Sequence, residues 1–323
     1  MDPLPLVLWL GDPGAAGNPL LGGKFGSLGT SVAEGLPVPP GFGITTHAYR
    51  SFLGESGLAA EAVAAAYAEL GRRCGERDVP VAVRSSGEAE DLAGASFAGQ
   101  YDTFLWVRGA DAVLAHMRRC WAGLFGAAVL SYRPAGEAVA GGADVAICVG
   151  VQRMVDARTA GVMFTLNPLN GDRSKVMVEA VWGLGEGVVK GDVPPSRFCV
   201  DKVTREIGLR EIVPQGEEYR FNTSTGAVGL FPVPPDREGR ACLGDDELQR
   251  LVQLGRDIEK SRGGTPLDIE WAIGPDGAIA VLQVRPETVW SARARAPIKL
   301  AGPPIAHVLT RMSAPAVAMK PKT

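Results

Sequence analysis

A strand-like apolar run that leads into a glycine-rich loop constrains this 323-residue chain more than any other segment. Residues 81–86 read Val-Ala-Val-Arg-Ser-Ser, and the loop that follows contains Gly-Ala-Ser-Phe-Ala-Gly at 94–99. Glycine allows a backbone to approach a ligand closely, and backbone N–H groups can bind anionic oxygens. An arginine guanidinium is a planar, permanently charged partner for phosphate. The segment therefore predicts a strand that delivers a cation to a phosphate-covering loop.

The composition excludes several classes of protein. Hydrophobic residues make up 46% and charged residues 21%, which is ordinary for a globular chain, and the net charge of −3 gives no bulk attraction to nucleic acid or anionic membranes. The five cysteines form no Cys-x-x-Cys pair, which favours reduced thiols over a disulfide scaffold or zinc site. No apolar run approaches the roughly 18 residues that span a bilayer. We expect a cytoplasmic protein with no nucleic-acid or membrane partner.

Hydrophobic periodicity predicts a mixed α+β chain. The expected helices cover residues 24–34, 47–53, 58–71, 110–124, 126–133 and 246–260. The expected strands cover residues 41–45, 79–85, 103–107, 145–154, 160–163, 175–180, 198–201, 205–207, 267–273 and 278–284. Side-chain oxygens can accept from the free N–H groups at a helix start, so we expect Thr46 and Asp245 to cap the helices that follow them.

The last expected hairpin holds a cluster of polar residues. Polar and apolar residues alternate along 267–273, so Asp268 and Glu270 share one face of the strand. A four-residue turn at 274–277 would make Glu270 and Gln283 diagonal neighbours on one face of the sheet. An ordinary exposed polar face is the alternative interpretation of this pattern.

The expected register of this hairpin has a chemical consequence. It pairs Glu270 with Val281 and places Val281, Gln283 and Arg285 on one face of the partner strand. A carboxylate beside an amide oxygen suits Mg²⁺, which prefers oxygen ligands. Arg285, just before Pro286, adds a cation at the end of the strand. The hairpin therefore predicts a magnesium and phosphate site.

A series of different short motifs lies between residues 22 and 286. They occupy 22–24 (Gly-Gly-Lys), 39–49, 83–91, 96–103, 151–155, 161–165, 183–189, 268–271 and 283–286. Each motif alone is weak, but the ordered set resembles the ATP-binding domain of the phosphoenolpyruvate synthase and pyruvate phosphate dikinase family. Rifampin phosphotransferase and the ATP-binding subunit of phenylphosphate synthase belong to the same group.

The resemblance implies an α+β ATP-grasp fold, in which ATP lies between two lobes. The implied lobes are residues 1–152 and 153–296, followed by a tail or linker at 297–323. By matching position, the resemblance also implies these roles: phosphate contacts for Lys24 and Arg84, the covering loop for Gly99 and Thr103, adenine contacts for Gln152 and Met154, Mg²⁺ ligation for Glu270 and Gln283, and stabilisation of the transferring phosphates for Arg285. A lone Gly-Gly-Lys is also compatible with a surface helix lysine at Lys24.

The resemblance further implies a dikinase-type phosphotransferase that uses Mg·ATP and yields AMP and phosphate. In the family, a histidine on a separate swivelling domain carries the phosphoryl group. The three histidines here are His47, His116 and His307, and only His47, in Thr-Thr-His-Ala, mimics the motif around that histidine. Its motif follows a turn that belongs to the ATP domain, however. We therefore expect the histidine-bearing domain and an acceptor-binding subunit to lie on other chains, without which this chain is inactive overall.

Other functions remain compatible with the sequence. The chain could be a non-catalytic nucleotide-sensing module, the excised ATP domain of a larger dikinase such as an antibiotic phosphotransferase, or an ATP-grasp ligase that forms an acylphosphate. A start at Met1 and a short basic tail favour a subunit over an excised domain. The motifs do not encode the final phosphoryl acceptor.

Overall fold

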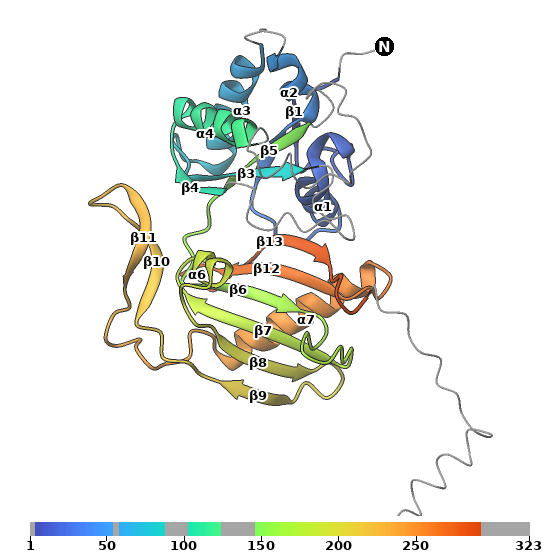
Figure 1. Ribbon diagram of the computed structural model, residues 1–323, viewed down its shortest axis with the longest axis vertical. Coiled ribbons are helices and arrows are strands. Elements are labelled where there is room, and N and C mark those ends of the chain that lie inside the picture. The colour runs from blue at the N-terminus through green and yellow to red at the C-terminus, as the bar shows by residue number, and fades with distance from the viewer. Residues whose placement is uncertain (1–3, 54–57, 88–102, 124–145, 292–323) are drawn as a thin grey trace, which may run out of the picture. The chain divides into compact units, whose positions relative to one another are not determined.

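The computed structural model describes residues 4–53, 58–87, 103–123 and 146–291 (Figure 1). Within these ranges the chain is a mixed α+β protein, as expected, and has two main antiparallel sheets. Four expectations lie outside the described residues: Gly99 of the covering loop, the helix at 126–133, His307 and the tail at 297–323. None of the helices in the described part is long and apolar enough to cross a membrane.

The first sheet carries the arginine of the opening motif. Its strands follow the order β1–β2–β5–β3–β4, with bounds β1 Val7–Trp9, β2 Gly41–Ile44, β3 Val81–Gly87, β4 Thr103–Val107 and β5 Ile147–Arg153. Successive side chains of a strand point to opposite faces. Val81 and Val83 are therefore buried in a core on one face of β3, while Arg84 and Ser86 belong to the other face. Ser86 donates to the carbonyl of Leu21 at 2.9 Å, at the start of α1.

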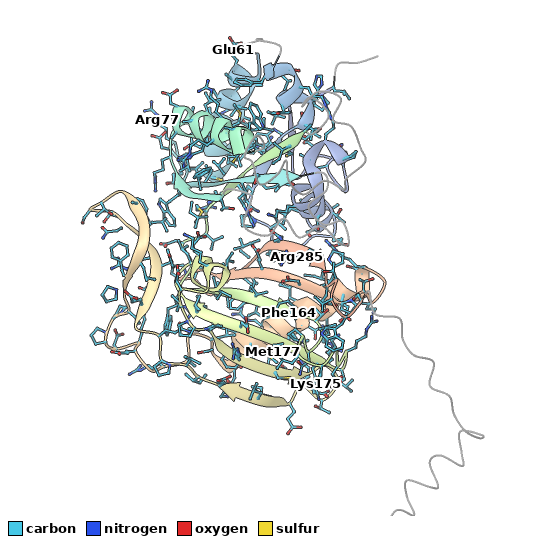
Figure 2. The ribbon with its side chains drawn as sticks, in the orientation of Figure 1. Glu61, Arg77, Phe164, Lys175, Met177 and Arg285 are labelled. Atoms are coloured by element: carbon cyan, nitrogen blue, oxygen red, sulfur yellow. The ribbon has the colours of Figure 1, made fainter. Side chains whose placement is uncertain are left out.

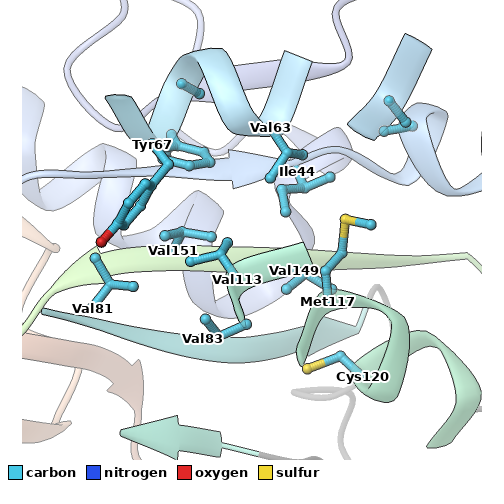
Figure 3. Packing of buried hydrophobic residues seen from close by; sticks show 14 of the residues in the cluster. Ile44, Val63, Tyr67, Val81, Val83, Val113, Met117, Cys120, Val149 and Val151 are labelled. Atoms are coloured by element: carbon cyan, nitrogen blue, oxygen red, sulfur yellow. The ribbon is translucent and has the colours of Figure 1, made fainter. Parts of the chain in front are cut away.

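Helices pack against both faces of the first sheet. They are α1 Gly22–Ala33, α2 Thr46–Leu53, α3 Leu58–Cys74 and α4 Ala110–Gly123, and a 3₁₀ turn, η1 Pro19–Leu21, precedes α1. Figure 3 shows the main core, in which Val149 and Val151 of β5 pack with Tyr67 of α3 and Met117 of α4. Helix α1 has a separate small core with Leu10, Ala15 and Cys148, and so covers the face that carries Arg84.

The second sheet carries the predicted metal ligands. Its antiparallel strands follow the order β13–β12–β6–β7–β8–β9, with bounds β6 Thr159–Phe164, β7 Lys175–Trp182, β8 Ser196–Asp201, β9 Ile207–Glu211, β12 Leu267–Ile273 and β13 Ile279–Pro286. Helix α7 (Asp245–Ser261) buries Leu248, Leu251 and Ile258 against it. These residues recur at helical spacing, which gives α7 one apolar face. Ile269 and Trp271 of β12 complete this core.

Two small elements complete the fold. The short helix α6 (Glu186–Lys190) begins within the glycine-rich motif at 183–189, and the hairpin of β10 (Glu217–Asn222) and β11 (Ala227–Pro232) forms a separate two-stranded sheet. This hairpin is not among the strands expected from the sequence. The hairpin contacts the first sheet through two stacked aromatic rings. Phe221 of β10 lies parallel to Trp106 of β4, with ring centroids 4.8 Å apart.

The two predicted helix caps were wrong by one residue. Helix α2 already includes Thr46, and the hydroxyl of Thr45 accepts from the N–H of Ala48 at 3.1 Å. Helix α7 already includes Asp245, and its capping residue is Gly244, whose N–H donates to the Glu247 carboxylate at 3.1 Å. In both cases the chain enters the helix one residue earlier than the pattern of polar residues indicated.

Candidate functional site

Arg84 connects the two sheets through three acceptors. Its Nη2 donates to Gln283 Oε1 at 2.9 Å and to Glu270 Oε2 at 3.2 Å, and its Nη1 lies 3.4 Å from the carbonyl oxygen of Leu282. The Arg84 side chain is 13% exposed and that of Glu270 is 25% exposed, so solvent screens this ion pair only in part. The two side chains predicted to bind Mg²⁺ therefore converge on one cationic nitrogen.

A β-bulge produces this convergence, and the predicted register was wrong. Ile273 pairs with Ile279, so five residues, 274–278, connect the strands where four were expected. Trp271 pairs with Val281, and Glu270 then pairs directly with Gln283, which leaves Leu282 as an extra residue on β13. A bulge of this kind re-aims the side chains that follow it.

The bulge also changes the face on which Val281 lies. Val281 is fully buried in the core with Trp271. The expectation that Val281 shares a face with Gln283 was therefore wrong. Glu270 and Gln283 are direct partners across the strands, where the sequence predicted diagonal neighbours. Direct cross-strand partners are closer than diagonal ones, so the two oxygen-bearing side chains are better placed to share a ligand than predicted.

Arg285 is held by the carboxylate of Asp268, a residue for which no role was expected from the sequence. Figure 2 labels Arg285, which lies on β13. Asp268 and Arg285 are cross-strand partners, and Arg285 Nε and Nη2 lie 2.8 and 2.7 Å from Asp268 Oδ2. The Asp268 side chain is 10% exposed, whereas that of Arg285 is 49% exposed. Burial raises the pKa of Asp268, and the neighbouring Arg285 opposes this effect. The Arg285 side chain is therefore anchored by Asp268, while about half of its surface is exposed to solvent.

Thr103 and Lys24 lie on elements adjacent to Arg84. Thr103, the first residue of β4, is exposed and is the direct cross-strand partner of Arg84. Lys24 is partly buried in the first turn of α1, the helix that packs on the face of the sheet carrying Arg84. A hollow of about 430 Å³ lies beside that turn, lined by Gly17, Asn18, Pro19, Gly22, Gly23, Gly26 and Ser27.

Gln152 and Met154 lie at the end of β5 and make contacts within the protein. The Gln152 side chain is 3% exposed, and its Nε2 donates to the carbonyl of Pro39 at 3.3 Å. The Met154 N–H donates to the carbonyl of Pro80 at 2.8 Å. These contacts fix the strand end from which the chain passes toward the second sheet. Adenine binding at Gln152 and Met154 stays a prediction.

The donor set fits magnesium better than a transition metal. In the part of the chain that the structure describes, no group of three or more His, Cys, Asp or Glu side chains is arranged to hold a metal ion. Glu270 and Gln283 together offer a carboxylate and an amide oxygen at a point where a cationic nitrogen already lies. Mg²⁺ is commonly bound by one or two protein oxygens together with substrate phosphates and water. The pair is therefore compatible with Mg²⁺ that arrives with a nucleotide.

Comparison with known proteins identifies relatives along most of the chain. Residues 18–62 and 59–301 match the family described as pyruvate phosphate dikinase, AMP/ATP-binding domain. A probable phosphoenolpyruvate synthase of Methanocaldococcus jannaschii is 37% identical over 89% of this chain, which corresponds to 27% of that protein. A second probable phosphoenolpyruvate synthase, from Methanothermobacter thermautotrophicus, is 39% identical over 83% of this chain and 44% of its own length.

Other similar proteins have different names. The prodigiosin synthesizing transferase PigC of Serratia marcescens is 39% identical over 83% of this chain, which corresponds to 31% of that protein. Among solved structures, D-alanyl-alanine synthetase A of Vibrio cholerae matches 86% of this chain and 58% of its own, with 11% identity and a TM-score of 0.35. This chain thus spans less than half the length of each of the three sequence relatives.

Proposed function

Because the chain belongs to the family of pyruvate phosphate dikinase AMP/ATP-binding domains, which have the ATP-grasp fold, we propose that it is the ATP-using component of a dikinase-type phosphotransferase. It would bind Mg·ATP and pass a phosphoryl or pyrophosphoryl group to a histidine on a partner domain or subunit. The observation that carries the proposal is the convergence of Glu270 and Gln283 on one nitrogen of Arg84. This arrangement concentrates both metal-binding and phosphate-binding groups at one point.

The proposed chemistry relies on charge and position. Phosphoryl transfer needs aligned reactants and neutralised phosphate oxygens more than covalent chemistry by the enzyme. Glu270 and Gln283 would hold Mg²⁺, which when bound neutralises charge on the phosphate oxygens. Lys24 and Arg84 would contact the phosphates, and Arg285 would stabilise charge on the group in transfer. Asp268 would hold Arg285 in place for this role.

The proposed reaction balances with a partner histidine. A neutral imidazole nitrogen of the partner attacks the β-phosphorus of ATP, which forms a P–N bond and breaks the bond from that phosphorus to the oxygen shared with the α-phosphate. AMP leaves with that oxygen. Water then releases the γ-phosphate as orthophosphate, and the phosphoryl group left on the imidazole passes to the final acceptor. The products are AMP and phosphate, as the resemblance implies.

Two findings support a partner on another domain or chain. This chain matches 27% to 44% of the phosphoenolpyruvate synthases reported above, so those proteins contain further regions outside the match. In addition, His116 packs against the ring of Phe104 with centroids 4.2 Å apart, and burial lowers its pKa. An imidazole in this packed setting is poorly suited to carry a phosphoryl group between sites.

The names of the relatives suggest that the acceptor is chosen elsewhere. Proteins called phosphoenolpyruvate synthase and one called prodigiosin synthesizing transferase are similar to this chain to nearly the same degree. We infer that this domain supplies the ATP-using half of the reaction, and that a separate acceptor-binding part determines the product.

The decisive test supplies a partner that can carry the proposed histidine. The chain is incubated with Mg·ATP alone and with the region of the Methanocaldococcus jannaschii relative that lies outside its match to this chain, in its native form or with the histidine that becomes labelled replaced by alanine. We expect AMP and orthophosphate only with the native partner, and label from [β-³²P]ATP on the partner. ATP binding without turnover in any mixture would instead indicate a nucleotide sensor. ADP formation that depends on an added carboxylate would indicate a ligase.

A further inference from the structure

The face of α1 that looks toward the second sheet is clamped by one arginine. Arg262, the residue that ends α7, donates to Ser31 Oγ at 2.8 Å and to Ser27 Oγ at 3.1 Å. Its Nη2 also lies 3.4 Å from a carboxylate oxygen of Glu34, just after α1. The Arg262 side chain is 17% exposed, so this clamp is largely shielded from water. A single guanidinium thus contacts three side chains along one side of a helix from a distant part of the sequence.

Ser27 extends this clamp to the strand that carries Gln283 and Arg285. Its hydroxyl, which accepts from Arg262, donates to the backbone carbonyl of Val284 at 2.5 Å. Val284 lies between Gln283 and Arg285 on β13. The hydrogen-bonded chain from Arg262 through Ser27 to Val284 therefore joins the end of α7, the middle of α1 and the predicted metal-binding strand.

The spacing along α1 connects this clamp to Lys24. Lys24, Ser27, Ser31 and Glu34 follow one another at intervals of three or four residues. Residues at these intervals lie on one face of an α-helix. Lys24 is therefore on the same side of α1 as the residues that Arg262 holds, one turn nearer the start of the helix. The rotation and approach of α1 that Arg262 sets also determine where the Lys24 side chain begins.

We propose that Arg262 is a positioning residue that aims Lys24 at the phosphates of bound ATP. This inference rests on the proposed function, since it takes Lys24 as a phosphate contact. Arg262 would act at a distance: it touches neither ATP nor the metal, but it fixes the helix that carries Lys24 against the strand that carries Gln283 and Arg285. A guanidinium suits this task because its planar fork can bind two hydroxyls and a carboxylate together, which a lysine ammonium does less well.

A double-mutant cycle tests the proposal by calorimetry with Mg·ATP as the probe. We expect Arg262→Gln to weaken Mg·ATP binding by about tenfold, the effect of losing one charge-assisted contact. Lys24→Met alone should weaken binding to a similar degree. Adding Arg262→Gln to Lys24→Met should cost almost nothing further, because the contact that Arg262 positions is already gone. Adenosine, which lacks phosphates, should bind all four proteins equally.

Control variants separate positioning from general stability. Arg205 also reaches α7, at the Gln249 carbonyl 2.7 Å away and at Gln253, but it does not contact α1 in these bonds, so Arg205→Gln should leave Mg·ATP binding unchanged. Arg262→Lys keeps the charge with fewer directed donors and should give an intermediate loss. This variant also allows the comparison should Arg262→Gln fold poorly.

The outcomes distinguish this inference from the proposed function. Additive losses in the double variant, an equal loss of adenosine binding, or no loss in Arg262→Gln would each overturn the positioning role. If the wild-type chain bound no Mg·ATP, both the proposed function and this inference would fail. If the cycle behaved as expected but no partner ever yielded AMP, only the proposed transfer function would fail.

Discussion

Glu270 and Gln283 face each other directly across β12 and β13, because Leu282 is left out of the ladder as an extra residue. Their side-chain oxygens meet at Nη2 of Arg84, at 3.2 and 2.9 Å. A cation of the protein itself thus lies where the proposed metal ligands converge. We expect a divalent cation at these oxygens to compete with the guanidinium, which would then be available to phosphate.

The first prediction concerns this exchange. We expect Arg84→Gln to raise the affinity of the nucleotide-free chain for Mn²⁺ by about tenfold, because the metal no longer competes with two charge-assisted hydrogen bonds. The same change should weaken Mg·ATP binding, because a phosphate contact is lost. Electron paramagnetic resonance of free Mn²⁺ measures the first effect, and calorimetry measures the second.

Arg285→Gln is the matched control for this exchange. Like Arg84→Gln it removes one positive charge, here on β13 and not on β3, but Arg285 bonds to Asp268 and not to the two converging oxygens in the contacts described above. If both variants raised Mn²⁺ affinity equally, loss of local positive charge would explain the result, and the exchange at Arg84 would be refuted.

The second prediction separates binding from transfer at Arg285. With a functional partner present, Arg285→Ala should lower the rate of AMP formation by about a hundredfold, because electrostatic stabilisation is strongest in the transition state. The dissociation constant of Mg·ATP should change by less than about threefold, since Arg285 would add little to ground-state binding. Rapid-quench kinetics and calorimetry give the two values. Equal losses in both, or no loss in either, would remove the role given to Arg285.

The third prediction concerns the turn that starts α1. Gly22 has a φ of +64°, and a Cβ placed there would lie 2.3 Å from the carbonyl oxygen of Ser86. We expect Gly22→Ala to destabilise the fold by about 3 kcal/mol, from backbone strain and overpacking together. Urea unfolding measures the change.

Gly35→Ala provides the comparison for Gly22. Gly35 has a φ of +77°, but nothing lies within 4 Å of a Cβ built there. This variant should therefore show the strain alone, about 1 kcal/mol. A loss at Gly22 no larger than that at Gly35 would mean that the close approach of Gly22 to Ser86 is unimportant.

The fourth prediction is a pH dependence. Glu218 is 5% exposed, and burial raises its pKa above the ordinary value of 4.5, although Arg237 and Arg220 oppose this. A raised pKa in the folded state favours the protonated form, so its contribution to stability is complete below pH 4.5 and is lost as the pH rises through the folded pKa. Glu218→Gln should therefore melt at the same temperature as the wild type or higher at neutral pH, and should lose less stability between pH 4.5 and 7. A lower melting temperature at pH 7 would show that the ion pairs outweigh burial.

The local sequence pattern correctly predicted strands in which polar and apolar residues alternate within a few positions. The strands 103–107 and 267–273 are confirmed with their expected bounds. The hairpin β10–β11 was missed because charged residues interrupt the apolar pattern of β10, and because its aromatic contact is with Trp106, in a distant segment of the chain. The Leu282 bulge was missed for a related reason: register depends on how Val281 and Trp271 pack in the core, which the turn sequence does not encode.

For the candidate site too, some features could be predicted from local sequence and others could not. The ordered motifs correctly identified the family, and with it Arg84, Glu270 and Gln283 as candidates. Their mutual contact could not be predicted, because it joins segments 186 and 199 residues apart. The contacts of Asp268 and Arg262 could not be predicted either, since each is made with a partner on another element and no local motif marks it.

The way α1 packs against β13 has a consequence for solubility. β13 is the outermost strand of its sheet, and an uncovered edge strand offers backbone groups to which another chain can add a strand. Here the Val281 N–H bonds to the Pro37 carbonyl at 2.9 Å, and the Val284 carbonyl bonds to Ser27. The segment that includes Ser27 and Pro37 therefore also covers part of the edge of the strand that carries Gln283 and Arg285, and hinders edge-to-edge aggregation there.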